Sequence, residues 1–533
     1  MIRSYIRIAL RNLWKYKGYT FINILGLAMG MASVILIMLY VQSELRYDRY
    51  HSQGDQIYRL NIQATNPQTG ETSERWVGPY RLADELKVDF PDIPQIIRIG
   101  TRSRELITYQ DALYVEENVT FVDPDIFQVL DFPLSAGDPL TALVDPFSVV
   151  VTEEIAQKYF GTEAPLGKVL RFQEQDFVVT GIIEKVPEHS QFQFDVFASI
   201  NCGPQIFSRI VLENWGEGYG ATFAMLPVGK SPEDYQARLA EFVSAKLEAW
   251  SAFSPRIKMQ PLPKLYLHSK EIGNFIPSGD ITYVYAFSFI ALFILIIACI
   301  NFMNLATARS SLRAREVGLR KVVGAQRMQL ISQFLSESIV LSLLSLGLAM
   351  VIANWLLPFF NSLAGKEMEL QVFSNPNLLL TLLGIAIFVG VAAGSYPALL
   401  LSGFRPVKVL GSTSGMGLEG STLRKVLVTF QFASSILLLI VTGVVNNQLQ
   451  YCQNMDLGFD KDHLVLISGT PTEFRGQYNQ FRAELMSNPS IVNSAASSRV
   501  PPGNLSSSLR ARPEGVPEDE QKGMQTVWTD FDF

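Results

Sequence analysis

Five long apolar segments alternate with polar stretches along the chain. Each supplies roughly the twenty apolar residues that a bilayer core of about 30 Å requires, which predicts five membrane-spanning helices. The first segment is too long for a cleavable signal peptide, and the stretch YVQSELRYD at its end contains no small-residue cleavage site. The predicted spans are residues 19–41, 283–304, 338–360, 377–400 and 426–445.

The stretch between the first two spans, residues 46–280, has the pattern of a folded α+β domain. SVVVT at 148–152 is apolar and β-branched, as in a buried strand, and FVVTGII at 177–183 predicts another strand. EEIAQKYF at 153–160 begins with acidic residues and precedes Gly161, which is typical of a short capped helix. The predicted fold class is therefore an α+β membrane protein, in which an α-helical transmembrane bundle carries a large α+β domain between spans one and two.

Composition agrees with a few spans joined to a large water-exposed part. The 533-residue chain is 48% hydrophobic and 18% charged, with a mean hydropathy of +0.18 and a formal net charge of −6. Three cysteines and four histidines are scattered, and there is no HExxH or CxxC motif, so we expect no disulfide framework, metal site or cofactor. GTEAPLGK at 161–168 differs from a phosphate-binding loop, because five residues separate its glycines and Val169 follows, so we expect a turn there.

Lysine and arginine mark the cytoplasmic side of a membrane protein. They gather before the first span, in the loop 305–330 and in the linker 401–425, whereas the loop between spans three and four has no basic excess. We therefore expect the first three of these segments to be cytoplasmic. Residues 46–280 and the stretch 447–533 are expected to lie outside, the latter as the start of a second outside domain.

The first eighteen residues, 1–18, have a periodicity of their own. Apolar residues share one helical face and basic residues share another, which suits an amphipathic helix in the cytoplasmic interface with its basic face toward lipid head groups. A simple positive-inside anchor would need the charges but not the phased apolar face. The apolar face holds Ile2, Ile6, Ala9 and Leu13, and the basic face holds Arg3, Arg7, Arg11 and Lys15.

None of the five predicted spans contains Asp, Glu, Lys, Arg or His. Proton- and ion-coupled carriers need such groups within the membrane, so secondary transport is disfavoured and the energy for any work must come from elsewhere. Two GxxxG motifs, Gly26 with Gly30 and Gly390 with Gly394, predict close helix packing. Because glycine is common in membrane helices, chance explains either motif about equally well.

The loop 305–330 has a two-sided pattern when it is drawn as one helix. Glu316 and Arg320 stand four residues apart in the order that favours a helix-surface ion pair. A charged stripe beside an apolar stripe predicts a lever that presents a docking surface to a cytoplasmic partner, and a positive-inside loop that happens to be helical is the alternative. The charged stripe comprises Arg309, Arg313, Glu316, Arg320 and Arg327, and the apolar stripe comprises Leu312, Leu319 and Val323.

The segment EVGLRKVVGAQRMQLISQFLSES at 316–338 resembles a characteristic segment of FtsX/MacB-type ABC transporter permeases. LRNLWKYKGYTFINILGLAMGMA at 10–32 resembles the opening helix and first span of that family. VVVTEEIAQKYFGTEAPLGKVLRF, with FVVTGIIEKVPEHSQFQFD after it, resembles the periplasmic core domain, and SYPALLLSGFRPVKVLG resembles the exit from the fourth span. These matches follow one another in the family's order and cover most of the chain.

The resemblance implies that the loop 305–330 is a coupling helix docked on a separate cytoplasmic ATPase. It also implies a permease of the bacterial inner membrane with a cytoplasmic N-terminus. Its periplasmic domain would move with ATP hydrolysis (mechanotransmission) to export or extract a substrate (efflux). Since the sequence holds no ATP-binding motif, the ATPase would act in trans. A periplasmic adaptor or substrate protein is a further expected partner, and nucleic acid is not. The implied ATPase contacts are Glu316, Gly318, Arg320, Lys321, Gly324 and Ala325.

A regulatory relay of the same fold, controlling a periplasmic partner such as a cell-wall hydrolase, is the alternative function. A sensor receptor is less favoured because no cytoplasmic segment exceeds about 30 residues, which is too short for a signalling domain. An enzyme in its own right is disfavoured because no catalytic constellation is present.

Two sequence echoes predict a parallel internal repeat. Leu423 and Arg424 precede the fifth span as Leu10 and Arg11 precede the first, and FVDPDIF around Asp123 returns as WTDFDF at the end of the chain, both about 410 residues later. We therefore expect a chain of the eight-span type that stops partway through its second outside domain. A natural five-span protein with a long outside tail is the alternative.

Overall fold

The structure is a computed structural model that divides into two compact units. The first comprises Met1–Ser103 with Glu117–Leu457, and the second comprises Arg104–Glu116 with Gly458–Phe533. Nearly all of the predicted interfacial helix and most of the linker 401–425 lie outside the described residues. The structure describes residues 11, 14, 17–65, 67, 70–216, 218–247, 254–308, 310–372, 374–403, 421–455, 463–467, 477–497, 508–511 and 522–525.

Five long helices in the first unit are apolar enough to cross a membrane, which confirms that part of the predicted fold class. Each contains one predicted span and extends beyond it at both ends. The longest, α12, ends where Gly365 adopts a left-handed conformation (φ 63°) that disfavours a side chain. The bounds are Lys17–Leu45 for α2, Ile281–Ala308 for α10, Arg327–Ala364 for α12, Pro376–Gly403 for α13 and Ser421–Asn454 for α15.

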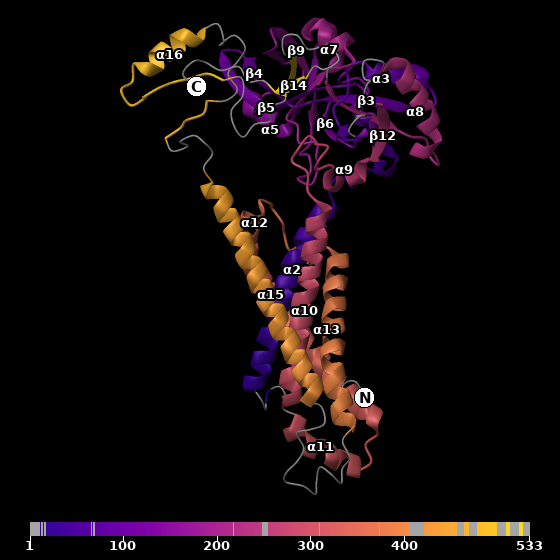
Figure 1. The fold of residues 1–533 in the computed structure, drawn as a ribbon, viewed down its shortest axis with the longest axis vertical. Coiled ribbons are helices and arrows are strands. Elements are labelled where there is room, and N and C mark those ends of the chain that lie inside the picture. The colour runs from indigo at the N-terminus through magenta and orange to yellow at the C-terminus, as the bar shows by residue number, and fades with distance from the viewer. Residues whose placement is uncertain are drawn as a thin grey trace. The chain divides into compact units, whose positions relative to one another are not determined.

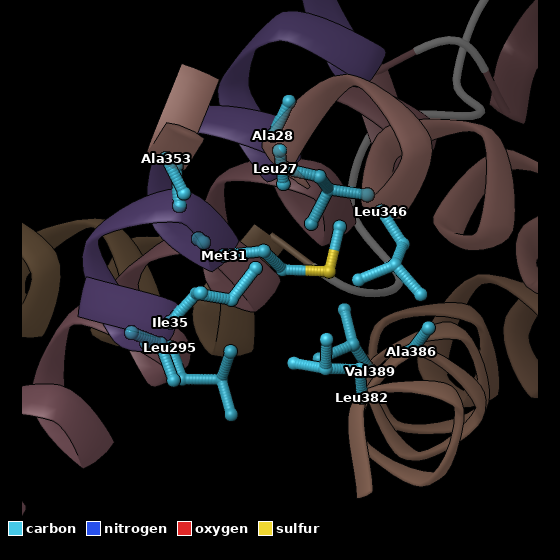
Figure 2. Close-up of a cluster of buried hydrophobic side chains, with 14 of the residues drawn as sticks. Leu27, Ala28, Met31, Ile35, Leu295, Leu346, Ala353, Leu382, Ala386 and Val389 are labelled. Atoms are coloured by element: carbon cyan, nitrogen blue, oxygen red, sulfur yellow. The ribbon is translucent and has the colours of Figure 1, made fainter. Parts of the chain in front are cut away.

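Helices α2, α10, α12 and α13 pack around one apolar core (Figure 1). Helix α12 packs against both α13 and α2, and α10 packs against α2 and α13. Figure 2 shows Met31 extending from α2 toward Leu346 of α12, with Val389 of α13 nearby. Helix α15 contacts α10, and Asn304 of α10 donates a hydrogen bond of 3.3 Å to Gln431 of α15.

Between α2 and α10 the chain forms an α+β domain, which confirms the rest of the predicted fold class. The predicted strand 148–152 is β7, and the predicted capped helix 153–160 is α5, whose first turn donates a backbone hydrogen bond to the Thr152 side chain. The strands are β1 Ile57–Thr65, β2 Thr72–Arg75, β3 Gln95–Gly100, β4 Ser103–Tyr109, β5 Ala112–Val122, β6 Leu134–Ala136, β7 Ser148–Thr152, β8 Val169–Phe172, β9 Gln175–Ile183, β10 Val196–Ser199, β11 Gly220–Met225 and β12 Arg256–Pro261.

The strand pairing is mostly antiparallel. Strand β1 pairs with β11, β12 and β2, and β11 pairs on its other side with β3. Strand β10 pairs in parallel with β5 and antiparallel with β7, and β7 pairs in parallel with β9. Strand β9 also pairs antiparallel with β8 and β6.

Helices cover the sheet and complete two apolar cores. One core lies under α3 and α8, and the other gathers phenylalanines of several loops and strands with α4 and α9. Helix α9 stands immediately after the last strand, so it begins the return of the chain toward α10. The helices are α3 Leu82–Asp89, α4 Ile126–Val129, α5 Glu153–Phe160, α6 Gly203–Ile206, α7 Arg209–Glu213, α8 Pro232–Lys246 and α9 Leu262–His268.

The second unit contains β4 from Arg104 onward, β5 up to Glu116 and the C-terminal stretch from Gly458. Its described elements are the helix α16, Tyr478–Met486, and an antiparallel hairpin of β13, Ser508–Ala511, with β14, Lys522–Gln525. Asp530 and Asp532 of the predicted repeat lie outside the described residues.

Candidate functional site

The predicted docking loop forms a helix, α11, Ser310–Val322, followed by a tight turn into α12 (Figure 1). Gly324 makes this turn with φ 99°, and the Ala325 backbone N–H donates to the Arg320 carbonyl at 3.0 Å. Because a side chain rarely adopts that backbone conformation, glycine suits this position. We call residues 310–330 the α11 elbow. Arg309 and the side chains of 310–315, including Leu312 and Arg313, lie outside the described part of the chain.

An apolar anchor holds the inner face of the α11 elbow. Val317 is only 1% exposed and packs with Leu330 and Phe334 of α12 and with Ala398 and Leu401 of α13. The neighbouring Gly318 is buried as well. Burial of a valine side chain contributes about 1.5–3 kcal/mol, so this contact fixes the position of α11 against two membrane helices.

Two basic residues reinforce that anchor with hydrogen bonds. Arg320 donates to the Gln333 side chain of α12 at 2.8 Å and to Glu316 at 2.6 Å, so the predicted ion pair at four-residue spacing is present. Lys321 Nζ donates to the Ser402 carbonyl at 2.6 Å, one residue before the end of α13. A cation is favourable at this position because the free carbonyl groups of a helix C-terminus carry partial negative charge.

Four large apolar side chains of the α11 elbow are exposed, beside the exposed polar residues Glu316, Gln326, Arg327 and Gln329. Leu319, Val322, Val323 and Met328 are 59%, 64%, 86% and 70% exposed. Such side chains in one short segment are a poor surface for water and a good surface for a protein partner. We call these four residues the apolar cap.

The six residues predicted to contact an ATPase therefore have different surroundings. Glu316 and Gly324 are exposed, Ala325 is partly buried and Gly318 is buried. Arg320 and Lys321 are both partly buried and are engaged with α12 and α13. The stripe of Leu319 and Val323 signalled the apolar cap in the sequence, but Val322 and Met328 lie off that stripe and were missed.

All four predicted packing glycines lie where another helix comes close. A Cβ added to Gly390 would lie 2.7 Å from the Cα of Ile339 in α12, and one added to Gly394 would lie 2.5 Å from Ser338 Oγ. On α2, a Cβ at Gly30 would lie 2.7 Å from Ala298 Cβ, whereas one at Gly26 would lie 3.2 Å from the Asn301 side-chain amide. Three of these distances are too short for real Cβ atoms, so the helices approach closely there, against backbone at Gly390 and against small side chains at Gly394 and Gly30.

No group of three or more His, Cys, Asp or Glu side chains is arranged to hold a metal ion within the ranges that the structure describes. Cys202 and Cys299 are buried free thiols, and Cys452 is an exposed one. The feature that stands out among the described residues of the first unit is a short helix beyond the predicted spans, tied to two membrane helices and carrying exposed apolar side chains.

Two known protein families match different parts of this chain. Residues 20–242 match the MacB-like periplasmic core domain, and residues 288–406 match the FtsX-like permease C-terminal domain. The chain belongs to the FtsX/MacB type of ABC transporter permeases. It is thus a multi-pass membrane protein with an extracytoplasmic domain of the periplasmic type.

Individual relatives are distant in sequence. The macrolide export ATP-binding/permease protein MacB of Bdellovibrio bacteriovorus is 24% identical over 267 residues, which cover 49% of this chain and 38% of MacB. The uncharacterized ABC transporter permease YvrN of Bacillus subtilis is 24% identical over 425 residues, 76% of this chain and 99% of YvrN. The uncharacterized permease YknZ of Bacillus subtilis is 22% identical over 374 residues, 64% of this chain and 82% of YknZ.

Proposed function

We propose that this chain is the permease subunit of an ABC transporter whose ATPase is a separate cytoplasmic protein. ATP hydrolysis on that protein moves the extracytoplasmic domain and so exports or extracts a substrate. The positive-inside rule orients the chain in a bacterial inner membrane with its N-terminus and the α11 elbow in the cytoplasm. The match covers 99% of YvrN, which is named a permease alone, whereas MacB is named an ATP-binding/permease protein.

The observation that carries this proposal is the two-sided α11 elbow. Its inner face is fixed to α12 and α13 through Val317, Arg320 and Lys321. Its exposed side includes the apolar cap. A partner that binds the cap would displace α11, and the anchors would pass that displacement to both membrane helices.

On this proposal, four of the six predicted contact residues have two different roles. The apolar cap, with Glu316 and Gly324 beside it, forms the contact with the ATPase. Arg320 and Lys321 instead position α11 on the bundle, so their removal would loosen the lever while leaving the apolar cap in place. The contact is thus expected to depend on hydrophobic burial more than on surface charge.

The test is to place a charge in the apolar cap. Val323→Asp should prevent copurification of the full chain with its ATPase and abolish stimulation of ATP hydrolysis, because a carboxylate in an apolar contact would be buried without a partner. Val228→Asp is the matched control, since Val228 is equally exposed (87% against 86%) but lies in the α+β domain. If Val323→Asp retains the ATPase as well as the control does, the docking role is wrong.

A further inference from the structure

A partly buried lysine lies at the opposite end of α12 from the α11 elbow. Lys366 follows Gly365 directly, and its ammonium group pairs with the carboxylate of Glu44 at the end of α2. The Lys366 side chain is 17% exposed and the Glu44 side chain is only 4% exposed. Lys366 also donates to the hydroxyl of Ser43 at 3.4 Å.

Three tyrosines surround the same ammonium group. The Nζ of Lys366 lies 5.3 Å from the ring centroid of Tyr40, 5.2 Å from that of Tyr47 and 5.9 Å from that of Tyr266. All three distances are within the range of a cation–π interaction. The rings of Tyr47 and Tyr266 are stacked, with centroids 3.5 Å apart. We call Glu44 and these three tyrosines the lysine cage.

The lysine cage joins segments that are far apart in the sequence. Tyr40 and Glu44 belong to α2, whereas Tyr266 belongs to α9 of the α+β domain and donates to Glu44 at 3.3 Å. Gly279, just before α10, packs closely against the lysine cage. A Cβ added to it would lie 2.7 Å from the Tyr266 ring and 2.8 Å from the Glu44 carboxylate. The loop after α12 is thus attached where α2 enters the domain and the chain returns to α10.

One continuous helix separates the α11 elbow from the lysine cage. Helix α12 has 38 residues, so it is about 57 Å long at 1.5 Å per residue. Its first turns hold Leu330, Gln333 and Phe334, which contact α11, and its last residue is two positions before Lys366. A displacement of α11 therefore reaches the lysine cage through a single secondary-structure element.

The chemistry of the contact is suited to a mechanical link. A well-packed apolar cluster would stabilise these segments at least as well as a buried ion pair. An ion pair with hydrogen bonds differs in being directional, and pulling the partners apart leaves two charges without compensation in a nonpolar setting. The contact therefore resists separation of the α12–α13 loop from the end of α2.

We propose that Lys366 is a positioning residue that transfers movement of α12 to the base of the extracytoplasmic domain. Helices α2 and α10 are covalently continuous with that domain, whereas the loop after α12 contacts Tyr266 of the domain through Lys366. This inference rests on the proposed function, because the movement originates at the α11 elbow.

The experiment measures a distance within the full chain in complex with its ATPase in lipid nanodiscs. Spin labels are placed at Val228 of the α+β domain and at Leu363 near the end of α12, which are 87% and 76% exposed, in a Cys452→Ser background. With the lysine cage intact, we expect a single narrow distance distribution that is the same without nucleotide and with ATP. Lys366→Met should lose that narrow distribution and make it depend on nucleotide.

Two further variants make the result decisive. Lys270→Met is the matched control, because Lys270 pairs with Asp280 in the same junction but is 60% exposed, and its distribution should stay narrow. Exchanging the charges in Glu44→Lys with Lys366→Glu should restore the narrow distribution. If Lys366→Met fails to accumulate in the membrane, Glu44→Gln replaces it, since glutamine keeps the size of the side chain and can still accept from Tyr266.

The outcomes separate the two proposals. A narrow distribution in Lys366→Met, or in Glu44→Gln where that variant replaces it, overturns the positioning role of Lys366. A wild-type chain that binds no ATPase overturns the proposed function instead. Loss of the narrow distribution in the Lys270→Met control would show that any change at the junction has this effect, which also overturns the specific role of Lys366.

Discussion

The predicted membrane spans and the extracytoplasmic domain differ in how they treat ionisable groups. In the bundle, buried hydroxyls donate to backbone carbonyl groups: Ser345 to Leu341 and Ser338 to Phe334 within α12, and Ser342 to Ala386 of α13. Neighbouring helices approach each other at small residues. The predicted spans contain no ionisable group, because a charge surrounded by lipid is costly.

The extracytoplasmic domain buries charges and compensates them. Asp123 accepts hydrogen bonds from the backbone N–H, Nε and Nη2 of Arg98 at 2.6, 2.9 and 2.9 Å. Burial alone would raise the pKa of Asp123, but the hydrogen bonds and the positive charge of Arg98 lower it below its ordinary value. Arg98 also pairs with Asp84. This region therefore keeps both charges while excluding water.

In a second cluster of the same domain, burial favours the neutral forms of the ionisable groups instead. Burial raises the pKa of Asp48 to about 7, although its carboxylate accepts a hydrogen bond from the Gln191 backbone. Burial lowers the pKa of His51 to about 4, and its Nδ1 accepts from the Asp131 backbone at 3.0 Å. The difference teaches that a fold surrounded by water can bury ionisable groups by pairing or by neutralising them, whereas the predicted spans of the bundle contain none and the buried Glu44 and Glu337 lie outside those spans.

The largest expected effect follows from removing the buried ion pair of Asp123 with Arg98. Asp123→Ala should lower the free energy of opening of the surrounding strands by about 3–5 kcal/mol, because it leaves Arg98 buried with only Asp84 as its carboxylate partner. Hydrogen exchange of the β3 and β5 amides in the full chain measures this. Asp92→Ala is the control, since its pair with Arg238 is about half exposed and worth less than about 1 kcal/mol. Equal effects of the two substitutions would contradict the contrast.

The opposite pKa shifts of Asp48 and His51 predict that their effects on stability largely cancel as pH changes. The folded Asp48 stays protonated between pH 3.8 and about 7 while the unfolded one ionises, so its stabilising effect is complete below pH 3.8 and is lost as pH rises. The folded His51 stays neutral between about 4 and 6.5 while the unfolded one is protonated, so its effect is lost as pH falls. The two contributions oppose each other, and stability should vary little between pH 4 and 6.5.

Asp48→Asn should remove the pH-dependent contribution of residue 48 and leave the opposing contribution of His51. Asparagine retains an acceptor for the Gln191 N–H and tolerates the left-handed backbone of residue 48 (φ 55°). The remaining His51 contribution then lowers stability by about 3 kcal/mol as pH falls from 6.5 to 4. His51→Asn should reverse the slope, since Asp48 then acts alone. Thermal unfolding midpoints across this pH range provide the measurement, and unchanged slopes in both variants would refute the assignment.

A smaller effect is expected from the closest helix contact in the bundle. Gly390→Ala should cost about 1–3 kcal/mol, because the new Cβ would collide with the Ile339 backbone and push α13 away from α12. Gly384→Ala on the same helix is the control, since nothing lies within 4 Å of its added Cβ. The thermal unfolding midpoint of the purified chain should fall only in the first variant. Equal midpoints would mean that α12 and α13 are not in backbone contact at Gly390.

The smallest effect is expected at Gly26 of α2. The nearest atom to an added Cβ belongs to the flexible Asn301 side chain, at 3.2 Å, so a rotation can relieve the contact. Gly26→Ala should therefore cost less than about 1 kcal/mol, partly offset by the higher helix propensity of alanine. Gly30→Ala, with Ala298 Cβ at 2.7 Å, should cost more. The same unfolding midpoint distinguishes them, and a larger loss in Gly26→Ala would reverse the ranking.

Several features followed from short stretches of sequence. The five apolar helices depend on the length of each apolar run, which a bilayer thickness dictates. Helix α5 depends on an N-cap at Thr152, two acidic residues in the first turn and a glycine after Phe160, and all of these are local. The pair of Glu316 and Arg320 depends only on helical spacing. Local sequence was sufficient to predict each of these three features.

Only the tertiary structure decided which side of the short helix α11 packs on the bundle and which side stays exposed. Drawn alone, α11 offers Arg320 and Lys321 as surface charges, but α12 and α13 supply Gln333 and the Ser402 carbonyl that turn them inward. Likewise, Lys366 appeared in an unremarkable loop, because its partner Glu44 is 322 residues away in the chain. Contacts of this kind arise from how long helices pack, and local sequence patterns contain no information about which distant residues will meet.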